Sequence, residues 1–185
     1  MQSRLNLVAV LSSALIFISA STTHSEVRET RENKHYTVSG ASPADVRASM
    51  NKVRPKGFDA YTSWNIRWNY TYRQANGRCA IASVTTRLAI AYTMPRVETQ
   101  NANLQKGFDA YLQKLRVHED GHANIGQSVA RKIDDGIAGL TAPACETLDQ
   151  RANALGEKLV KEGAAADIEY DRVTDHGKTQ GARWP

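Results

Sequence analysis

The hydrophobic pattern of this chain changes its period once, and that change constrains the fold more than any other feature. Between Trp64 and Arg73, aromatic or apolar side chains alternate with polar ones, and Asn76-Gly77, a dipeptide typical of tight hairpin turns, follows. A second alternating run ends before Pro95, so we predict an antiparallel hairpin with strands at about 62–75 and 79–93.

The segment after the hairpin has the period of a helix. From Leu104 onward, apolar residues recur every three or four positions as far as Ile137. A break at 141–143 precedes a second helix at about 144–167, which would return antiparallel to the first. Strands followed by helices predict an α+β fold.

Weaker signals precede the hairpin. The residues at 26–34 are charged and predict a loose arm, and 35–38 predict a short strand. Ser42-Pro43 has the pattern of an N-cap followed by proline at the first helical position, so a helix is expected through about Asn51.

The N-terminal segment has the composition of a secretory signal peptide. Arg4 supplies a positive charge, and an apolar run that contains three serines leads to small residues before Glu26. We predict a signal peptide at 1–25, a single domain at 26–185 and a secreted or periplasmic protein. A retained anchor is the alternative, but the apolar run is short for a membrane span, so no stable membrane insertion is expected after cleavage. Cleavage is compatible with three positions, after Ala20, Ser21 or Ser25.

The two cysteines fit an oxidising compartment. Cys79 and Cys145 are an even pair in the mature chain, and we predict that they form a disulfide. Such a bridge closes a loop of 66 residues, which stabilises a fold by about 4 kcal/mol in the chain-entropy model. Zinc ligation by both cysteines is the alternative, but no CxxC pair supports it.

The charge of the chain does not predict a polyanionic partner. Lys and Arg total 24 against 19 Asp and Glu, giving a net charge of +5. The basic residues form no dense stripe interleaved with aromatics, so nucleic-acid binding is not expected.

One hexapeptide, Lys-Gly-Phe-Asp-Ala-Tyr, occurs twice, at 56–61 and at 106–111. The flanking residues do not extend the match. One copy precedes a predicted strand and the other lies in a predicted helix, so the pair is not expected to be a structural repeat.

The strongest chemical signal is the HExxH motif at 118–122. On a helix, His118 and His122 lie one turn apart on one face and can bind one Zn²⁺, while Glu119 lies toward a bound water. Both histidines are in phase with the apolar stripe, which indicates an inward face. Gly121 is unfavourable inside a helix and suggests close approach by another segment. The alternative is a pair of core histidines bonded to backbone carbonyls.

A catalytic zinc needs a third protein ligand and one open position. The motif does not continue to the longer form with a third histidine, because position 128 is serine. The segment 169–177, after the second predicted helix, is rich in metal-binding side chains. We predict His176 as the third ligand, with Asp171 as the alternative.

These motifs together resemble a bacterial family known only as a domain of unknown function, whose members are predicted to be secreted zinc-dependent proteases. The resemblance covers essentially the whole mature chain and implies a zincin-like metallopeptidase. It is carried by Tyr61-Thr62-Ser63-Trp64, Asn76-Gly77-Arg78-Cys79, 115–122, Cys145 and the tail 170–182.

The leading hypothesis is hydrolysis of a peptide or protein substrate by zinc-activated water. Glu119 would accept the proton of the water, and Tyr170 would stabilise the oxyanion, with Arg172 a weaker choice. An extended substrate could add to the edge of the hairpin as a further strand.

Two alternatives stay open at this point. In the first, the protein is a non-catalytic periplasmic module in which Asp171 and His176 both bind zinc and close the site. In the second, a zinc hydrolase acts on cell-wall peptides.

Overall fold

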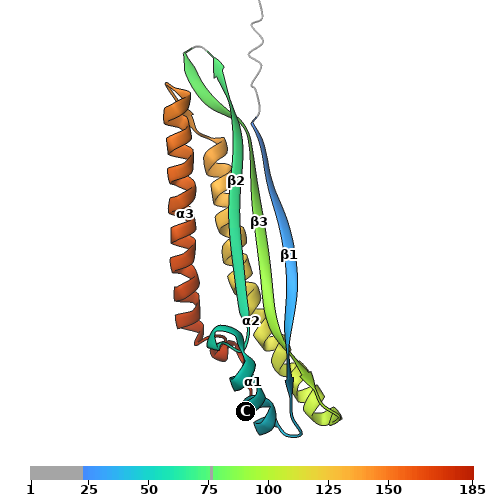
Figure 1. Ribbon diagram of the computed structural model, residues 1–185. Coiled ribbons are helices and arrows are strands. Elements are labelled where there is room, and N and C mark those ends of the chain that lie inside the picture. The colour runs from blue at the N-terminus through green and yellow to red at the C-terminus, as the bar shows by residue number, and fades with distance from the viewer. Residues whose placement is uncertain (1–22, 76) are drawn as a thin grey trace, which may run out of the picture.

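A mixed four-stranded sheet and two long helices form the two layers of an elongated α+β structure (Figure 1). The computed structural model describes residues 23–75 and 77–185, so most of the predicted signal peptide lies outside the described residues. The elements are β1 (His24–Ser39), α1 (Pro43–Val53), a 3₁₀ turn (Pro55–Gly57), β2 (Tyr61–Ala75), β3 (Arg78–Glu98), α2 (Ala102–Ala138), β4 (Thr141–Ala142), α3 (Cys145–Thr174) and a 3₁₀ turn (Lys178–Gln180).

The predicted hairpin is confirmed as β2 and β3. They pair antiparallel with Trp64 opposite Ile90, and the order in the sheet is β1-β3-β2. The prediction that the second strand ends before Pro95 is wrong. β3 continues to Glu98 because β1 pairs with it along the same stretch, with Tyr36 opposite Pro95.

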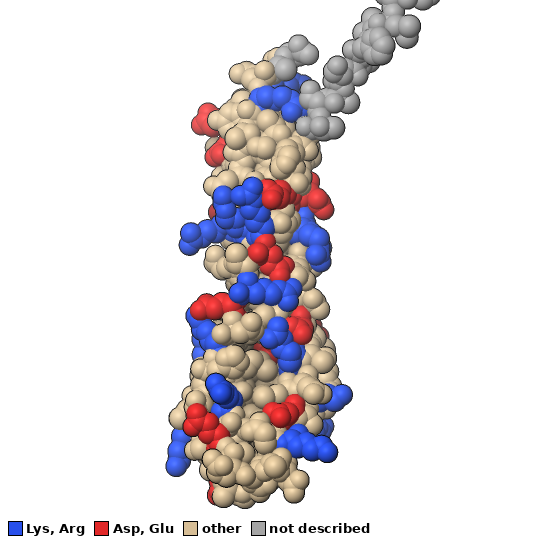
Figure 2. All heavy atoms as spheres, turned by 90° about the vertical axis from the view of Figure 1, so that its right-hand side faces the viewer, with Lys and Arg blue, Asp and Glu red and all other residues tan. Residues whose placement is uncertain are grey.

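The predicted loose arm is also wrong, since those residues belong to β1. This strand of 16 residues pairs in parallel with β3 and forms one edge of the sheet. Its charges form ion pairs two residues apart along the strand, such as Arg28–Glu26 at 2.8 Å, and the molecular face on the β1 side carries both signs interspersed (Figure 2). A charged edge strand gives no apolar alternation, and it discourages pairing with other chains.

The first predicted helix is confirmed as α1. Ser42 is its N-cap, the Ser42 side chain accepts from the Asp45 amide, and the Asp45 carboxylate accepts from the Ser42 amide. This reciprocal capping box satisfies two backbone donors that no helical carbonyl can reach.

The two long helices cover one face of the sheet. α2 buries its apolar stripe against β3, and α3 returns antiparallel to α2 (Figure 1). α3 ends at Thr174, so it extends seven residues beyond its predicted end at about 167. Gly156 and Gly163 of α3 leave room for the indoles of Trp68 and Trp64, and these indoles donate to Asn153 and Asp167 of the same helix.

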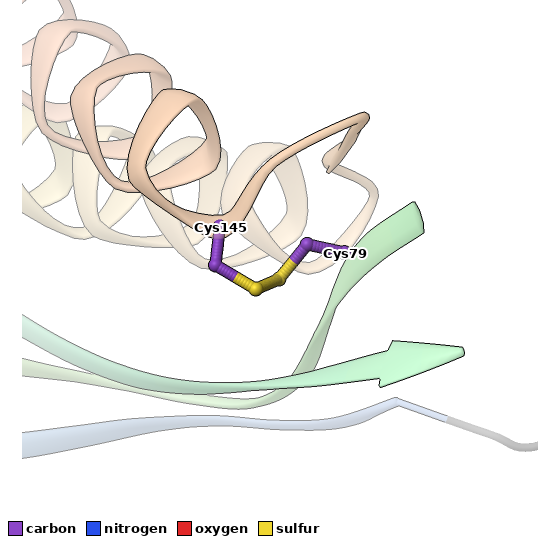
Figure 3. The surroundings of a disulfide bond; sticks show 2 residues. All are labelled: Cys79 and Cys145. Atoms are coloured by element: carbon purple, nitrogen blue, oxygen red, sulfur yellow. A yellow bond between two sulfur atoms is a disulfide. The ribbon is translucent and has the colours of Figure 1, made fainter. Parts of the chain in front are cut away.

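The predicted disulfide between Cys79 and Cys145 is confirmed (Figure 3). It joins the start of β3 to the start of α3, at the opposite end of the molecule from α1 (Figure 1). Among the described helices, none is sufficiently long and apolar to cross a membrane.

The two copies of the hexapeptide adopt different structures but contact each other. The first lies in the loop that leads into β2, and the second lies in α2. The hydroxyl of Tyr111 in the second copy donates to Asp59 in the first at 2.7 Å. The identity of the two segments is therefore not a structural repeat, in agreement with the prediction.

Candidate metal centre

Three metal-binding side chains meet between α2 and α3, toward the end of α3 that lies away from the disulfide. His118 and His122 come from α2, and Asp171 comes from the last turn of α3. Asp171 Oδ1 lies 3.1 Å from Nε2 of each histidine, and the two Nε2 atoms lie 3.3 Å apart. One atom from each residue therefore converges on a common point.

The spacing of residues along the two helices explains this convergence. His118 and His122 are four residues apart on α2, and Asp167 and Asp171 are four residues apart on α3, so each pair occupies one helical face. Because the helices are antiparallel neighbours, the two faces oppose one another over one turn. The carboxylates thus reach the imidazoles from the facing helix.

Each imidazole has an acceptor within hydrogen-bond distance of Nδ1. His122 Nδ1 lies 3.0 Å from Asp167 Oδ1, and a carboxylate oxygen accepts only. His118 Nδ1 lies 3.0 Å from Gln180 Oε1 and 3.4 Å from the hydroxyl of Thr174, whose own proton is donated to the Tyr170 carbonyl. With hydrogen on both Nδ1 atoms, the tautomer that a metal ion at Nε2 requires, both Nε2 atoms present lone pairs; a hydrogen on Nε2 would instead face Asp171 Oδ1 at 3.1 Å.

In that tautomer the group consists of acceptors without a donor. Two imidazole lone pairs and a carboxylate oxygen face each other at 3.1–3.3 Å. Such an arrangement is repulsive unless a cation, either protons or a metal ion, lies among the three atoms.

Burial and neighbouring carboxylates act in opposite directions on the two histidines. Burial holds the pKa of His118 below its usual value, although Gln180 and Asp171 oppose that effect. Burial also disfavours the charged form of His122, but Asp167 and Asp171 outweigh it and raise the pKa. The centre therefore attracts positive charge toward His122 and its two carboxylates.

Glu119 is buried beside the two histidines, with 3% of its surface exposed. Burial raises the pKa of its carboxyl group, and the Thr62 hydroxyl opposes this by donating to Oε2 at 2.6 Å. Thr62 lies near the start of β2, so the sheet holds the carboxylate of the helix in one orientation.

Tyr170 packs against His118 and is not one of the three residues that converge at the centre. Its ring stacks on His118 at 5.1 Å between centroids, and its hydroxyl contacts the His118 carbonyl at 3.2 Å and Gln180 Nε2 at 3.0 Å. The expected close approach at Gly121 is confirmed, because a Cβ there would lie 2.0 Å from the Tyr170 hydroxyl. Arg172, the weaker choice for an oxyanion donor, is exposed and paired with Glu169.

His176 lies beside His118, His122 and Asp171 but outside the group of three metal-ligating atoms. Its Nδ1 is 3.4 Å from Asp171 Oδ1, half of its side chain is exposed, and its ring packs against Phe58. After α3 ends, positive φ angles at Asp175, His176 and Gly177 reverse the chain. A Cβ at Gly177 would lie 2.9 Å from the His118 ring, so the turn brings the backbone directly onto that histidine. The structure thus groups Asp171, the alternative third ligand, with the two histidines.

The centre opens into a cavity of about 1070 Å³. His118, Glu119, His122, Asp171 and His176 line it, together with residues at the start of β2. Tyr170 is not among the lining residues. A molecule in the cavity could therefore approach Glu119 and the three metal-ligating atoms together.

Sequence reasoning missed the residues that orient the centre, namely Asp167, Thr62, Thr174 and Gln180. Asp167 carried a detectable signal, because its spacing of four from Asp171 matches that of the two histidines. The signal was lost when the second helix was predicted to end at about 167. Thr62, Thr174 and Gln180 lie in segments that carry the family resemblance, but only the fold brings them to the motif.

Comparison with known proteins gives one match. A model of the family described as "Bacterial protein of unknown function (DUF922)" matches residues 33–177, which include every residue of the centre except Gln180. The chain matches no curated protein and no solved structure.

Proposed function

Starting from a chain that belongs to the DUF922 family of bacterial proteins of unknown function, we propose that the centre on α2 and α3 binds zinc and hydrolyses peptide bonds. The observation that carries this proposal is the meeting of three metal-ligating atoms, from His118, His122 and Asp171, next to Glu119 and an open cavity. His118, Glu119 and His122 form the HExxH motif of zincins, so we also assign the chain a zincin-like arrangement.

The donor atoms fit zinc in type and in spacing. Imidazole nitrogen and carboxylate oxygen are both common zinc ligands, with bonds of about 2.0–2.2 Å. Two ligands in a tetrahedral site then lie about 3.3–3.6 Å apart. The separations of 3.1–3.3 Å among His118, His122 and Asp171 are close to that range, so little movement would be needed to accommodate the ion.

When bound, zinc would supply a Lewis acid that lowers the pKa of a water molecule and polarises a substrate carbonyl. Glu119 accepts a proton in this scheme and later delivers it to the leaving amine. The raised pKa of its carboxyl group brings its proton affinity nearer to neutral pH, and the Thr62 hydrogen bond keeps one oxygen occupied.

The remaining side chains have positioning roles. Asp167, Gln180 and Thr174 hold the two Nδ1–H groups, so both Nε2 atoms stay free for the ion. Tyr170 stacks on His118 and fixes that ring, which replaces the oxyanion role predicted for it. His176 is half exposed in the cavity, and we assign the oxyanion contact to its ring.

The start of β2 suggests how a peptide would bind. Tyr61, Thr62, Ser63 and Trp64 line the cavity, and β2 is an edge strand in the order β1-β3-β2. An extended substrate could hydrogen-bond to that edge and pass Glu119, giving main-chain recognition. The disulfide is consistent with a secreted or periplasmic location, where such a peptidase would act on exported proteins or cell-wall peptides.

A non-catalytic zinc module is the competing function, and His176 is the observation that favours it. If its ring rotated onto the ion, four protein ligands would close the site. The two functions differ in whether a position remains for another molecule. Displacement of a fluorescent hydroxamate by peptide, on the zinc-loaded protein, would favour the peptidase.

The direct test is Glu119→Gln, with zinc content and hydrolysis of unfolded casein measured on the same preparation. We expect full zinc binding and a loss of turnover of about 10²–10⁴-fold, the range for removal of a general base. Glu157→Gln, an exposed change of the same kind on α3, is the matched control and should leave turnover unchanged. A wild-type protein that binds zinc and cleaves neither casein nor wall peptides would refute the peptidase.

A further inference from the structure

The cavity that holds the candidate metal centre has a second region, formed by α1 and the C-terminal tail. Arg47 of α1, Arg54 at the end of α1 and Arg183 of the tail line this region. Asp59 is the carboxylate side chain that pairs with Arg47 and Arg54, and Arg47 Nε also lies 3.4 Å from the oxygen of Pro185. Three guanidinium groups therefore line this region beside one paired carboxylate side chain, which leaves a positive excess among the side chains.

Arg47 and Asp59 have structural contacts that occupy them. Arg47 donates to both oxygens of Asp59, at 2.9 and 2.7 Å, and to the Trp184 carbonyl at 3.1 Å. Asp59 also accepts from Tyr111 and Arg54. This pair fastens the tail to α1, and neither partner is available to a ligand.

Arg54 and Arg183 are different, because most of their donors are unused. Arg54 makes one contact, from Nη1 to Asp59 at 3.2 Å, and Arg183 makes one, from Nε to the Lys178 carbonyl at 3.1 Å. Among the described residues, no carboxylate pairs with Arg183, and the one that pairs with Arg54 is shared with Arg47. Both residues line the cavity, and their unused N–H groups are donors for a ligand there.

The wall formed by α3 combines the carboxylates of the centre, Asp167 and Asp171, with apolar side chains. Val160, Ala164 and Ile168 are its apolar residues, and Ile168 is 72% exposed. Phe58, at 41% exposure, faces the cavity from the loop before β2. An apolar side and a cationic side in one cavity would orient a substrate that carries an anionic group.

We propose that Arg54 and Arg183 form a subsite for a carboxylate of the substrate. This inference rests on the proposed peptidase function and adds a substrate class to it: peptides that carry a carboxylate on the part that occupies this region of the cavity. A guanidinium group matches a carboxylate in charge and in planar geometry, and two of them with free donors favour this ligand over a phenol or an amide. The carboxylate has two sources, the C-terminus of the peptide or an Asp or Glu side chain.

The test measures binding separately from catalysis. Fluorescent peptides that differ only in a C-terminal acid or amide, and a second pair with internal Glu or Gln, are titrated into zinc-loaded Glu119→Gln by anisotropy. We expect one acidic peptide to bind about tenfold more tightly than its neutral partner, with the difference reduced at high salt. The pair that shows the difference identifies the source of the carboxylate.

The same titrations on Arg54→Gln and Arg183→Gln, each added to Glu119→Gln, should remove most of this preference. Arg67→Gln, an exposed change on β2 outside the cavity, is the matched control and should retain it. Arg183 is exposed and makes one backbone contact, so its variant is informative even if Arg54→Gln, which loses the Asp59 contact, unfolds.

Equal binding of acidic and neutral peptides, or a preference that persists without both arginines, would overturn the subsite. Failure of the peptidase gives a different result. In that case the wild-type protein cleaves neither acidic nor neutral peptides, while the acidic preference in binding and its loss in the arginine variants are still measured.

Discussion

α2 carries two buried polar clusters, about four turns apart, and they differ in hydrogen-bond balance. Asp134, which is 2% exposed, accepts from the Thr86 hydroxyl at 2.8 Å and from the Ser25 hydroxyl. Each carboxylate oxygen of Asp134 thus has its own donor, Thr86 of β3 and Ser25 of β1, and the Ser25 contact is present in a mature chain cleaved after Ala20 or Ser21. At His118, His122 and Asp171, the acceptors instead face one another.

This comparison shows that burial of a polar group does not by itself identify a functional site. The Asp134 cluster is complete, because its donors match its acceptors, and it joins α2 to two strands. The cluster at the metal centre needs a cation to become complete. The balance of donors and acceptors therefore distinguishes a structural cluster from a candidate binding site.

The largest expected effect is loss of zinc on removal of a metal ligand. In Asp171→Ala, zinc affinity should fall well beyond the hundredfold expected for an outer partner, because one of three ligands is lost. His176→Ala should keep the metal and lose turnover. Zinc content after dialysis against a competing chelator measures metal retention in both variants, and casein hydrolysis measures the turnover of His176→Ala. If His176→Ala loses zinc and Asp171→Ala keeps it, the acceptor group of the structure is not the metal site.

A smaller effect is expected at Asp167, which acts through His122. Asp167→Asn replaces the carboxylate that accepts from Nδ1, and zinc affinity should fall by about 10–100-fold. Competition with a zinc-sensitive dye gives the affinity, and Glu162→Gln on the exposed face of α3 is the control. An unchanged affinity would show that the Nδ1 partner does not determine the tautomer.

At the complete cluster, the corresponding change should affect stability and not metal binding. Asp134→Ala leaves two hydroxyl groups without their acceptor, and the free energy of unfolding should fall by about 1–3 kcal/mol. Urea denaturation measures this, with the exposed neighbour change Asp135→Ala as control. Zinc affinity should be the same in both variants. A change in zinc affinity in Asp134→Ala alone would mean that the two clusters are coupled along α2.

The smallest effect concerns Asp59, whose carboxylate oxygens accept from two arginines and from the Tyr111 hydroxyl. Burial disfavours its charged form, but Tyr111, Arg47 and Arg54 outweigh burial and lower the pKa. A lowered pKa in the folded state stabilises the fold above the unfolded value of about 3.9, and this contribution is lost as pH falls through the folded pKa. For one proton the slope is at most about 1.4 kcal/mol per pH unit.

The measurement is the free energy of unfolding of zinc-free protein between neutral and acidic pH, for the wild type and Asp59→Asn. The difference between the two curves should shrink as the pH falls below about 4. A constant difference would show that Asp59 is equally charged in both states throughout the range.

Local sequence signals were sufficient for much of the fold. The alternation at 64–73 and the helical period from Leu104 predicted the hairpin and α2, because side-chain period depends on the element and not on its partners. The short strand predicted at 35–38 lies within β1, but the rest of β1 and the end of α3 were missed. The residues of β1 face water on an edge strand, and the last turns of α3 are charged, so neither has an apolar period to detect.

For the site, the sequence alone determined what lies within one helix. The HExxH spacing places His118, Glu119 and His122 on adjoining positions of α2, since the helical repeat fixes them relative to one another. The disulfide partners were also determined, because the chain has only two cysteines.

Only the tertiary structure decided which residues complete the centre. Asp171 and His176 are five residues apart in a segment with several metal-binding side chains, and both are compatible with zinc. The extra turns of α3 carry Asp171, one turn beyond Asp167, to the level of the two histidines, and the reversal at 175–177 turns His176 toward the cavity. The physical reason is that the packing of two antiparallel helices sets which turns face each other, and that register depends on contacts between distant residues.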